Sequence, residues 1–239
     1  MDKIDLSFVY DIAHELKGPV ITIEGFLNAL IEDFGLQLPK DAIIYLDYIE
    51  DAVKRLKSTI NDLLNLSIWS QKSYKIEKFF LKEIINSVLL RMKPIIIKKN
   101  ITIILKDSLP VIYGRKKQME LAWENLISNA IKYIGKNNPN PIVEIGITNI
   151  KNKQVIFIKD NGIGIEKRYI NKIFDMFQRT PSAKKESEGT GIGLFIVKNI
   201  IESHNGEIWV KSELGKGSIF YIYLPERQEN GSFKDNHIR

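Results

Sequence analysis

The sequence contains no cysteine, which excludes a disulfide framework and a thiolate metal site, although this absence does not identify a cellular compartment. It also lacks any uninterrupted run of the about 18 to 20 apolar residues that a membrane-spanning helix needs, and it shows no charged and then apolar leader. We therefore expect no membrane span in this chain and a cytoplasmic location.

The chain has no arginine-rich or base-stacking tract, although Lys and Arg outnumber Asp and Glu by 35 to 29. Because the lysines are scattered among nearly as many acids, the net charge of +6 favours a solvated basic surface and no nucleic-acid partner. At 239 residues and 44% hydrophobic content, the sequence can supply two small domains with packed cores.

Two amphipathic helices are predicted in the first part of the chain, because apolar residues recur there at steps of three and four. The first stripe starts after Val9, and the second follows a break at residues 35–39 whose glycine and proline favour a turn. Residues 1–69 are therefore expected to form a helical hairpin. The predicted stripe positions are Ile12, Leu16, Val20, Ile23, Leu27, Leu30 and Phe34, and then Ile43, Leu46, Ile49, Val53, Leu56, Ile60 and Leu63.

A single hairpin covers its two apolar stripes poorly, since each helix has an apolar face that one partner shields only in part. Two hairpins paired as a four-helix bundle would cover both stripes, which predicts a homodimer joined along them. The alternative is a hairpin that folds back on the rest of its own chain.

The pattern changes after a short polar stretch, Ser70-Gln71-Lys72-Ser73, and residues 70–75 are interpreted as a linker. The following residues, 76–226, are predicted to form an α/β sandwich, with helices on one face of a mixed sheet, so that the whole chain is of the α+β class. Residues 227–239 are polar and aperiodic, which predicts a frayed tail. The strand-like runs are 101–105, 142–147, 155–159, 206–210 and 218–224, and the helical stretches lie near 81–91, 116–134, 167–174 and 191–203.

Two glycine-rich segments follow a predicted helix that carries asparagines, and together they describe a nucleotide pocket. The segments are Asp160-Asn161-Gly162-Ile163-Gly164 and Gly189-Thr190-Gly191-Ile192-Gly193. On the helix upstream, Asn125, Asn129 and Lys132 lie on one face within one turn, because residues three and four apart are neighbours. Amides beside an ammonium group suit a metal-bound polyphosphate.

His14 is the only histidine of the first predicted helix. It lies two positions from both Ile12 and Leu16, so a rotation of about 100° per residue turns it away from the stripe and into water. Glu15 follows directly, and a carboxylate near an imidazole can take up its proton and make one ring nitrogen more nucleophilic. Pro19 lacks a backbone N–H and crowds the carbonyl of Glu15, so the helix should bend near His14.

Several motifs, in order, resemble those of sensor histidine kinases of two-component systems, and the resemblance covers nearly the whole chain. Residues Ala13-His14-Glu15-Leu16-Lys17-Gly18-Pro19-Val20 resemble the histidine box of that family. The resemblance implies a dimerisation and histidine-phosphotransfer hairpin over residues 1–69 and an ATP-binding catalytic domain of the GHKL, or Bergerat, type over residues 76–226. The asparagine box, first glycine box, phenylalanine box, second glycine box and last glycine turn are matched by Asn125 to Tyr133, Asp160 to Gly164, Phe174 to Phe177, Gly189 to Gly193 and Gly215 to Ser218.

The resemblance implies ATP and Mg²⁺ as ligands and gives a role to each residue of the pocket. Asn129 would coordinate Mg²⁺ with Asn125 in support, which fits the preference of Mg²⁺ for hard oxygen ligands. Lys132 would reach the phosphates, and Tyr133 would lie against the adenine ring. Asp160 would accept a hydrogen bond from the adenine amino group, which guanine lacks at that position.

Residues 179–190 are expected to form a mobile lid over the phosphates. Its lysines, Lys184 and Lys185, either contact phosphate or are simply solvated. Purely structural roles stay open for Asn125, which could cap or brace a neighbouring loop, and for Tyr133, which could lie at a core edge. The other residues implied in nucleotide binding are Gly162, Gly164, Arg179, Gly189, Thr190, Gly191, Gly193 and Leu194.

The implied activity is ATP-dependent phosphorylation of His14, with Glu15 beside it, followed by transfer to an aspartate on the receiver domain of a response regulator. Two positions depart from the pattern of the family. Gly18 stands where many relatives carry Thr or Asn, so we expect weak or absent phosphatase activity. Arg115 replaces a common aspartate, for which only a local change of contact is expected.

Two alternatives stay open at this point. An ATP-hydrolysing clamp or chaperone of the same nucleotide fold could use Glu124, next to Asn125, to activate water. A degenerate module that only binds a partner is the other alternative. The sequence leaves open the signal, the regulator, whether phosphorylation is cis or trans, and whether the chain is the cytoplasmic part of a longer membrane receptor.

Overall fold

The computed structural model describes residues 6–70, 75–106, 109–187 and 189–225. The chain divides into two compact units, with the division between residues 70 and 71. Most of the predicted linker and the predicted tail lie outside the described residues.

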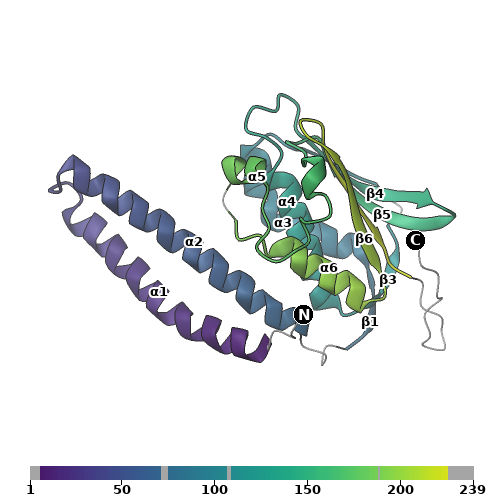
Figure 1. Cartoon of the computed structure of the whole chain (residues 1–239), viewed down its shortest axis with the longest axis horizontal. Helices are drawn as coiled ribbons and strands as arrows, with labels where there is room; N and C mark the ends of the chain where they lie inside the picture. The colour runs from purple at the N-terminus through teal and green to yellow at the C-terminus, as the bar shows by residue number, and fades with distance from the viewer. Residues whose placement is uncertain (1–5, 71–74, 107–108, 188, 226–239) are drawn as a thin grey trace. The chain divides into compact units, whose positions relative to one another are not determined.

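The first unit is a helical hairpin, as predicted (Figure 1). Helix α1 (Leu6–Phe34) and helix α2 (Lys40–Ser70) pack along their length, and residues 35–39 join them. Lys57 bridges the two helices, with its Nζ 2.6 Å from a carboxylate oxygen of Glu24. Because both partners of this ion pair are partly exposed, it contributes little to stability beyond the apolar contacts.

The two helices of the hairpin contact each other through residues spaced seven apart, which lie on one face of a helix. Only part of each predicted stripe is buried within one chain. Ala13 is also buried, although it was not predicted. The buried positions are Ala13, Val20 and Leu27 in α1 and Leu46, Val53 and Ile60 in α2.

The rest of the predicted stripes remains on the surface of the hairpin, apart from the half-buried Leu63, and the exposed fractions of these side chains lie between 39% and 50%. A single chain therefore buries only one edge of each amphipathic face. None of the helices within the described ranges is both long and apolar enough to cross a membrane. The exposed stripe residues are Ile12, Leu16, Ile23, Leu30, Phe34, Ile43, Ile49 and Leu56.

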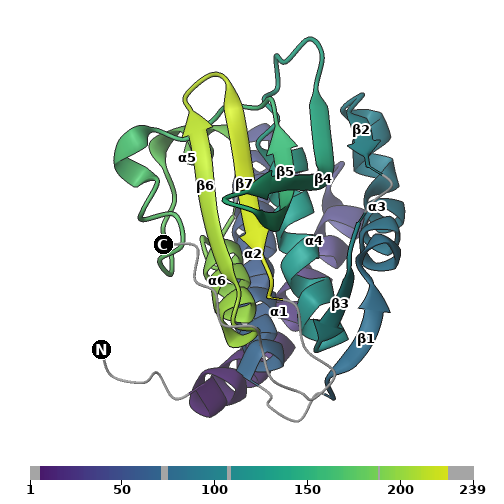
Figure 2. The same ribbon diagram turned by 90° about the vertical axis from the view of Figure 1, so that its right-hand side faces the viewer.

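The second unit is built on a five-stranded sheet in the order β2-β4-β5-β7-β6 (Figure 2). Strand β2 pairs with β4 in parallel, and the other pairs are antiparallel, so the sheet is mixed as predicted. Alternate residues such as Ile145, Ile158 and Val210 are buried on one face of the sheet. The strands are β2 (Thr102–Leu105), β4 (Ile142–Ile150), β5 (Lys153–Asp160), β6 (Glu207–Glu213) and β7 (Gly217–Tyr223).

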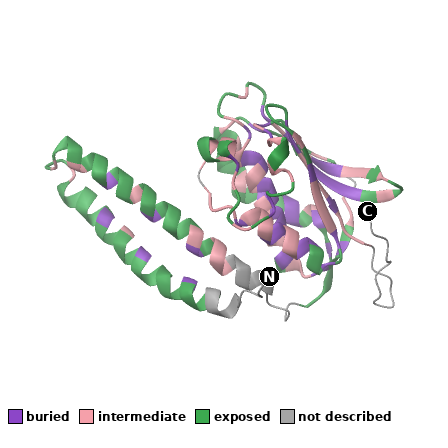
Figure 3. Cartoon of the chain, in the orientation of Figure 1, coloured by how far each residue is buried: buried purple, intermediate pink, exposed green. Residues whose placement is uncertain are grey.

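Helices α3 (Leu81–Lys98), α4 (Lys116–Lys132) and α6 (Gly193–Ser203) lie on one face of this sheet, with α4 between the other two (Figures 1 and 2). The core lies between these helices and the sheet, where buried residues gather (Figure 3). Trp123 and Ile127 of α4 are completely buried there. Helix α4 therefore forms the centre of the unit. Its buried face holds the helix in place and so fixes the position of the residues on its less buried face.

Several short elements of the second unit were not predicted. Strands β1 (Glu77–Phe80) and β3 (Val111–Gly114) form a separate two-stranded antiparallel sheet. Helix α5 (Pro181–Glu186) lies inside the predicted lid, where the Thr180 side chain caps its first turn and Pro181 opens it. These elements are too short for their periodicity to be recognised in the sequence.

Two predicted helix bounds in the second unit were wrong. The helix expected near residues 167–174 is limited to one 3₁₀ turn, η1 (Lys167–Tyr169), and turns follow it. Helix α3 runs past Pro94 to Lys98 instead of ending near residue 91. The carbonyl of Leu90, which Pro94 leaves without an N–H donor, belongs to a residue that is 71% exposed, so water can hydrate that side of the helix.

Candidate functional site

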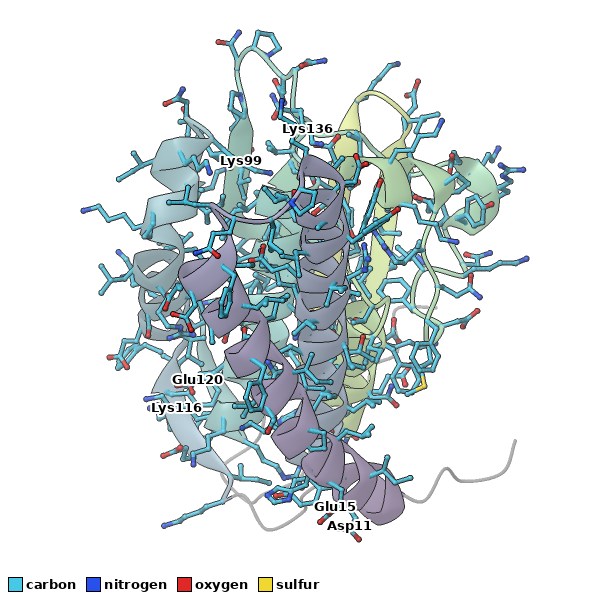
Figure 4. The ribbon with its side chains drawn as sticks, turned by 90° about the vertical axis from the view of Figure 1, so that its left-hand side faces the viewer. Asp11, Glu15, Lys99, Lys116, Glu120 and Lys136 are labelled. Carbon is cyan, nitrogen blue, oxygen red and sulfur yellow. The ribbon has the colours of Figure 1, made fainter. Side chains whose placement is uncertain are left out.

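His14 lies on the exposed face of α1, directly after the buried Ala13. The ring of Tyr10 lies 6.1 Å from the imidazole, centroid to centroid. Glu15 and Asp11, one turn apart, are also exposed and lie together at the same end of α1 (Figure 4). The imidazole is thus open to an incoming reactant and has carboxylates close to it along the helix.

The α1 helix continues through Pro19, one turn after Glu15. Thr22 Oγ1 donates a hydrogen bond to the carbonyl oxygen of Gly18 at 3.2 Å, in the turn that the proline interrupts. A Cβ built on Gly18 would meet no atom within 4 Å. Position 18 therefore has room for a side chain but carries none.

Helix α4 carries the three predicted pocket residues Asn125, Asn129 and Lys132 on its half-buried face. The Nδ2 of Asn125 donates to the carbonyl of Leu121 at 2.9 Å, which turns Oδ1 toward the start of α6. There, a Cβ on Gly193 would collide with Asn125 Oδ1. Asn125 thus braces the approach of α4 and α6, which differs from the structural role left open for it, the bracing of a loop.

The Asn129 amide is half-buried and makes no hydrogen bond with any residue that the structure describes. A partly desolvated amide without a protein partner is a suitable ligand for an incoming polar group or cation. Its side-chain oxygen is of the hard type that Mg²⁺ prefers. The residue set therefore fits a magnesium-bound phosphate at this point of α4.

Glu124 lies next to Asn125 but is directed toward α3. Its Oε2 is 3.2 Å from Nη2 of Arg91, and both side chains are about half exposed, at 47% and 49%. This ion pair offers no support for the alternative in which Glu124 activates a water molecule beside the phosphates.

Asp160 lies at the end of β5 with 7% of its surface exposed. Burial raises its pKa to about 6, and the backbone N–H groups of Gly162 and Ser218 oppose this shift. Both N–H groups donate to the same oxygen, Oδ1, at 2.9 Å and 3.3 Å. The hydrogen bonds that Asp160 accepts from described residues thus leave Oδ2 available for a donor on a ligand.

The glycines of the first glycine-rich segment lie where the backbone is tightly packed. A Cβ on Gly162 would collide with the carbonyl oxygen of Tyr133, and one on Gly164, which has φ +67°, would collide with that of Glu213. Both positions therefore require glycine for the loop to pack against its neighbours.

The loop after β5 is also fixed by side-chain amides that the sequence did not reveal. Asn161 Oδ1 accepts the N–H of Ile142 at 2.8 Å and its Nδ2 donates to Asn140 O at 2.7 Å. Asn138 Nδ2 donates to Asn161 Oδ1 at 3.1 Å and to Ile134 O at 3.1 Å. The Asn-rich composition of residues 137–140 is a signal in the sequence that could have pointed to this network.

The lid lies over the end of α4. Arg179 Nη2 donates to the carbonyl oxygens of Ala183, at 2.9 Å, and Ser187, so this guanidinium ties the middle and the C-terminal cap of α5 to the start of the lid. Burial raises the pKa of Tyr133, while the charge of Arg179 and a side-chain hydrogen bond from it lower that pKa. Tyr133 is thus part of the lid contact as well as of the pocket wall.

The far end of the lid approaches Lys132, the last residue of α4, and Tyr133, which follows it. A Cβ on Gly189 would lie 2.5 Å from Lys132 Nζ and 3.7 Å from the Tyr133 hydroxyl. Lys132 Nζ itself lies 5.5 Å from the centroid of the Tyr133 ring. Lys184 and Lys185, by contrast, are exposed on α5.

Helix α6 starts at Gly193, and its N-cap residue, Ile192, provides no side-chain cap. The backbone N–H groups of the first turn, including that of Leu194, therefore lack intrahelical acceptors and point out of the helix end. Gly191, with φ +77°, and Thr190, whose Oγ1 accepts the N–H of Ile192 at 3.3 Å, shape the approach to this end. Such an end suits a phosphate group.

His204 has a structural role that was not predicted. Its Nε2 accepts the N–H of Arg115 at 3.0 Å and its Nδ1 donates to Ile200 O at 2.7 Å, which fixes the tautomer. The histidine joins the end of α6 to the start of α4. Arg115, one of the two residues that depart from the family pattern, takes part in this joint through its backbone N–H.

Within the second unit, α4, the loop after β5, the lid and the start of α6 thus approach one another and bring one group of polar residues together. Asp160 offers a carboxylate oxygen in a buried setting, Asn129 an unused amide, and Lys132 an ammonium group. This arrangement can hold an adenine at one end and a polyphosphate at the other.

Two family models match the chain. The model described as the His Kinase A (phospho-acceptor) domain matches residues 6–71, and the model described as Histidine kinase-, DNA gyrase B-, and HSP90-like ATPase matches residues 114–228. The two matches fall on the hairpin and on the unit that contains Asp160.

Among curated proteins, the methanogenesis regulatory histidine kinase FilI of Methanothrix harundinacea is 35% identical over 91% of this chain and 24% of its own length. Cyanobacterial phytochrome B of Nostoc is 34% identical over 92% of this chain and 29% of its own. The sensor protein SrrB of Staphylococcus aureus is 30% identical over 95% of this chain and 39% of its own. The chain thus spans between about a quarter and two-fifths of these relatives.

Solved structures show the same architecture. Full-length ShkA in complex with AMPPNP matches 91% of this chain and 45% of that chain with a TM-score of 0.66, and its 21% identity supports likeness of fold alone. The catalytic domain of the histidine kinase ThkA, at 27% identity and a TM-score of 0.53, matches 63% of this chain and 95% of that one.

Proposed function

We propose, because this chain belongs to the sensor histidine kinases, that it transfers the γ-phosphoryl group of ATP to its own His14 and then to an aspartate of a response regulator. The observation that carries this proposal is an exposed imidazole on a hairpin in the same chain as a pocket with a buried, half-satisfied carboxylate. Neither feature alone would indicate a kinase.

Adenine selection is assigned to Asp160 and Tyr133. The free carboxylate oxygen of Asp160 would accept a hydrogen bond from the adenine amino group, and the ring of Tyr133 would lie against the base. Because Asp160 is buried, an amino donor also relieves the unfavourable burial of its charge. Guanine carries a carbonyl at the corresponding position, and two oxygen acceptors would then face each other.

The phosphates are assigned to Lys132, Arg179 and the N-terminus of α6. Arg179 is engaged by lid carbonyls in this structure, so binding a polyphosphate would require the lid to exchange those contacts. Mg²⁺ would be held by Asn129, with Asn125 supporting the helix contact, and it would neutralise charge on the phosphate oxygens. Gly189 and Thr190 at the end of the lid, with Gly191 directly after it, would allow this segment to follow the phosphates closely.

At His14, the lone pair of one ring nitrogen attacks the γ-phosphorus in line. The N–P bond forms as the bond from phosphorus to the β,γ-bridging oxygen breaks, and ADP leaves with that electron pair. Glu15 is assigned to accept the proton that the imidazole releases. The exposure of His14 then allows the phosphoryl group to pass on to a carboxylate of the regulator.

The homodimer is proposed from the exposed stripes of the hairpin. Their residues are apolar, they lie on one side of each helix, and a second hairpin would cover them as a four-helix bundle does. Dimerisation would also hold two copies of His14 on one rigid support.

The alternative function, an ATP-hydrolysing clamp, has no specific support, since Glu124 is paired with Arg91. Incubation of the purified chain with γ-labelled ATP and Mg²⁺ tests the proposal directly. We expect acid-labile, base-stable label on the protein, lost in His14→Gln and kept in the control Asp33→Asn, an exposed change near the far end of α1. Phosphate released without retained label, or label that survives His14→Gln, would contradict the proposal.

Weak or absent phosphatase activity is proposed from Gly18, which offers no side-chain oxygen beside the histidine turn. Fast loss of phosphate from a phosphorylated regulator on adding the chain and nucleotide would contradict this part. Gly18→Thr, which has space for its Cβ, is expected to raise the rate if a hydroxyl at this position orients water.

A further inference from the structure

Three polar side chains form a row across neighbouring strands beneath the proposed adenine site. Asp160 of β5 lies directly opposite Ser218 of β7, which lies directly opposite Ser212 of β6. Residues directly opposite on adjacent strands project from the same face of a sheet. Asp160 and Ser218 are buried, at 7% and 6% exposure, and Ser212 is half-buried at the end of the row.

Ser212 joins two separate backbone segments through its hydroxyl group. Its Oγ accepts the N–H of Ile165, in the loop after β5, at 2.8 Å. It donates to the carbonyl oxygen of Gly217, at the start of β7, at 2.7 Å. One further bond, from Gly215 N–H to Ile163 O at 2.8 Å, fastens the same two segments. The Ser212 side chain thus holds the loop that follows Asp160 against the turn that precedes Ser218.

The same hydroxyl also determines where the proton of Ser218 points. The two serine oxygens lie 2.9 Å apart, and a hydroxyl group has only one proton to donate. Since Ser212 donates its proton to Gly217 O, the proton shared by the two serines is that of Ser218. The Ser218 hydroxyl is therefore directed away from Asp160, and only its backbone N–H reaches the carboxylate.

Building on the proposed ATP binding, we propose that Ser212 is a positioning residue for adenine recognition, which fastens the two segments around Asp160 and keeps the Ser218 hydroxyl from occupying its free carboxylate oxygen. Ser212 itself touches neither the base nor the carboxylate. Its effect is transmitted through Ser218 and the backbone of Ile165.

Removal of the Ser212 hydroxyl has two distinguishable consequences. The N–H of Ile165 loses its acceptor, which loosens the loop. The Ser218 proton is released, and the ionised Asp160 beside it is the strongest acceptor within the row. That new hydrogen bond would compete with the adenine amino group and would lower the pKa of Asp160, which burial otherwise raises to about 6.

The test measures ATP affinity of the full chain by calorimetry between about pH 5 and 8, together with the kcat and KM of autophosphorylation. For Ser212→Ala we expect ATP binding to weaken by roughly tenfold, as for the loss of a well-placed hydrogen bond, with kcat at saturating ATP nearly unchanged. In the plot of ATP affinity against pH, the acid limb is the fall in affinity at low pH, where Asp160 takes up a proton. This acid limb should move to lower pH in Ser212→Ala. Ser212→Thr, which keeps a hydroxyl on a strand, should restore both.

The double variant Ser212→Ala with Ser218→Ala separates the proposed role from simple loosening. It should return the acid limb to its position in the unchanged protein, because no serine proton is left to reach Asp160. Ser203→Ala serves as the control, because it removes a hydrogen bond of 2.8 Å from a serine hydroxyl to the carbonyl of Ile200 at the end of α6. It should leave the acid limb in place. An acid limb that is unmoved in Ser212→Ala would overturn the proposal.

If Ser212→Ala does not fold, Ser218→Ala alone still decides the matter. With Ser212 in place, the Ser218 proton is already turned away, so the acid limb should stay where it is. A shift of the limb in Ser218→Ala would show that its hydroxyl acts on Asp160 in the intact protein and would overturn the proposal. An unchanged protein that binds no ATP would instead defeat the proposed function itself.

Discussion

The two units of this chain differ in how completely one copy covers its own apolar surface. In the second unit, Trp123, Ile127 and Ile158 are within 1% of full burial, between the helices and the sheet. In the hairpin, large apolar side chains such as Leu16 and Ile23 keep more than two-fifths of their surface exposed. The contrast shows that the second unit buries its own core within one chain, and it supports the proposal that the hairpin is half of a larger helical bundle.

The units also differ in charge. Residues 1–70 contain twelve Asp and Glu against six Lys and Arg, a net charge of −6, while residues 71–239 contain seventeen against twenty-nine, a net charge of +12. The modest overall charge of +6 therefore conceals two units of opposite sign. Long-range attraction between opposite charges speeds encounters and is screened by salt.

The largest effect is expected when the open side of the hairpin is made polar. Leu16→Asp combined with Ile23→Asp should abolish the dimer and, with it, more than about 99% of His14 phosphorylation, because a charge buried without a partner costs roughly 3 to 5 kcal/mol. Light scattering of the full chain should then give the mass of one copy. The control for the molecular mass is Ile21→Asp, whose side chain is 51% exposed on the other side of α1, compared with 42% for Leu16 and 48% for Ile23. A dimer that survives the double change would contradict the proposed interface.

A change at Asp160 in the second unit should have a smaller effect, which lowers ATP affinity but raises the stability of the ligand-free unit. Asp160→Asn is expected to weaken ATP binding by about tenfold to a hundredfold, because a good adenine acceptor is lost. At pH 8 it should also stabilise the ligand-free unit by about 1 to 3 kcal/mol, because burial of an ionised Asp160 is unfavourable. Urea unfolding and calorimetry measure the two effects.

The sign of that stability effect follows from the raised pKa. The folded-state pKa of Asp160 is about 6, compared with a usual value of 3.8, so the folded unit binds the proton more tightly than the unfolded chain does. Its contribution to stability is fully present below pH 3.8 and is lost as the pH rises through about 6. The advantage of Asp160→Asn should therefore disappear at low pH, and an advantage that persists there would contradict the assignment. Asp175→Asn, an exposed change, is the control.

The charge contrast predicts a moderate effect of salt. Raising the ionic strength from about 0.05 M to 0.5 M should slow autophosphorylation at saturating ATP by a few-fold, since the Debye length falls from more than 10 Å to about 4 Å. ATP affinity is measured at each salt concentration to separate this effect from weaker phosphate binding. Replacing Glu32 and Asp33 of α1 by their amides, far along the helix from His14, should reduce the salt dependence. Autophosphorylation rates that do not change with salt would contradict the idea that attraction between the two oppositely charged units speeds the reaction.

The sequence predicted those parts of the molecule that depend on local periodicity. The spacing of apolar residues was sufficient for the hairpin and the main sheet, because it records which face of each element is covered. Strand β3 and helix α5 are only four and six residues long, and so give no such record. The grouping of Asn125, Asn129 and Lys132 could be predicted because they share one helix.

Contacts between segments far apart in the chain could not be predicted. The row of Asp160, Ser218 and Ser212 depends on strand register, which the sequence does not state. The use of Arg179 to tie the lid helix depends on a fold of the lid that has no periodicity. The bond between His204 and Arg115 likewise joins residues 89 positions apart.

We expect His204 to give the stability of the second unit a smaller pH dependence, of opposite sign to that caused by Asp160. Burial lowers the pKa of His204, the hydrogen bond to the carbonyl of Ile200 opposes this shift, and the charge of Arg115 adds to it. The unfolded chain therefore binds this proton more tightly, and the stability that His204 contributes is lost as the pH falls below its usual pKa of 6.5. We expect a loss of at most about 1.4 kcal/mol per pH unit.

The loss of stability caused by His204 is best measured in Asp160→Asn, because the opposing titration of Asp160 is absent there. Urea unfolding at pH 7.5 and at pH 5.5 should show a steeper loss of stability in Asp160→Asn than in Asp160→Asn with His204→Gln, whose amide can still accept the N–H of Arg115. Equal losses in the two variants would rule out His204 as the group responsible.

The smallest expected effect concerns two glycines of α1, one of which directly precedes a proline. A Cβ on Gly18 or on Gly25 would meet no atom within 4 Å, so neither replacement by Ala is blocked by packing. Gly25→Ala should stabilise the hairpin by about 1 kcal/mol per chain, the usual difference in helix propensity. Gly18 precedes Pro19, whose ring disfavours a helical conformation for a residue with a Cβ, so Gly18→Ala should gain clearly less. Thermal unfolding of the full chain with both variants measures the difference, and an equal gain at the two positions would show that the proline does not constrain Gly18.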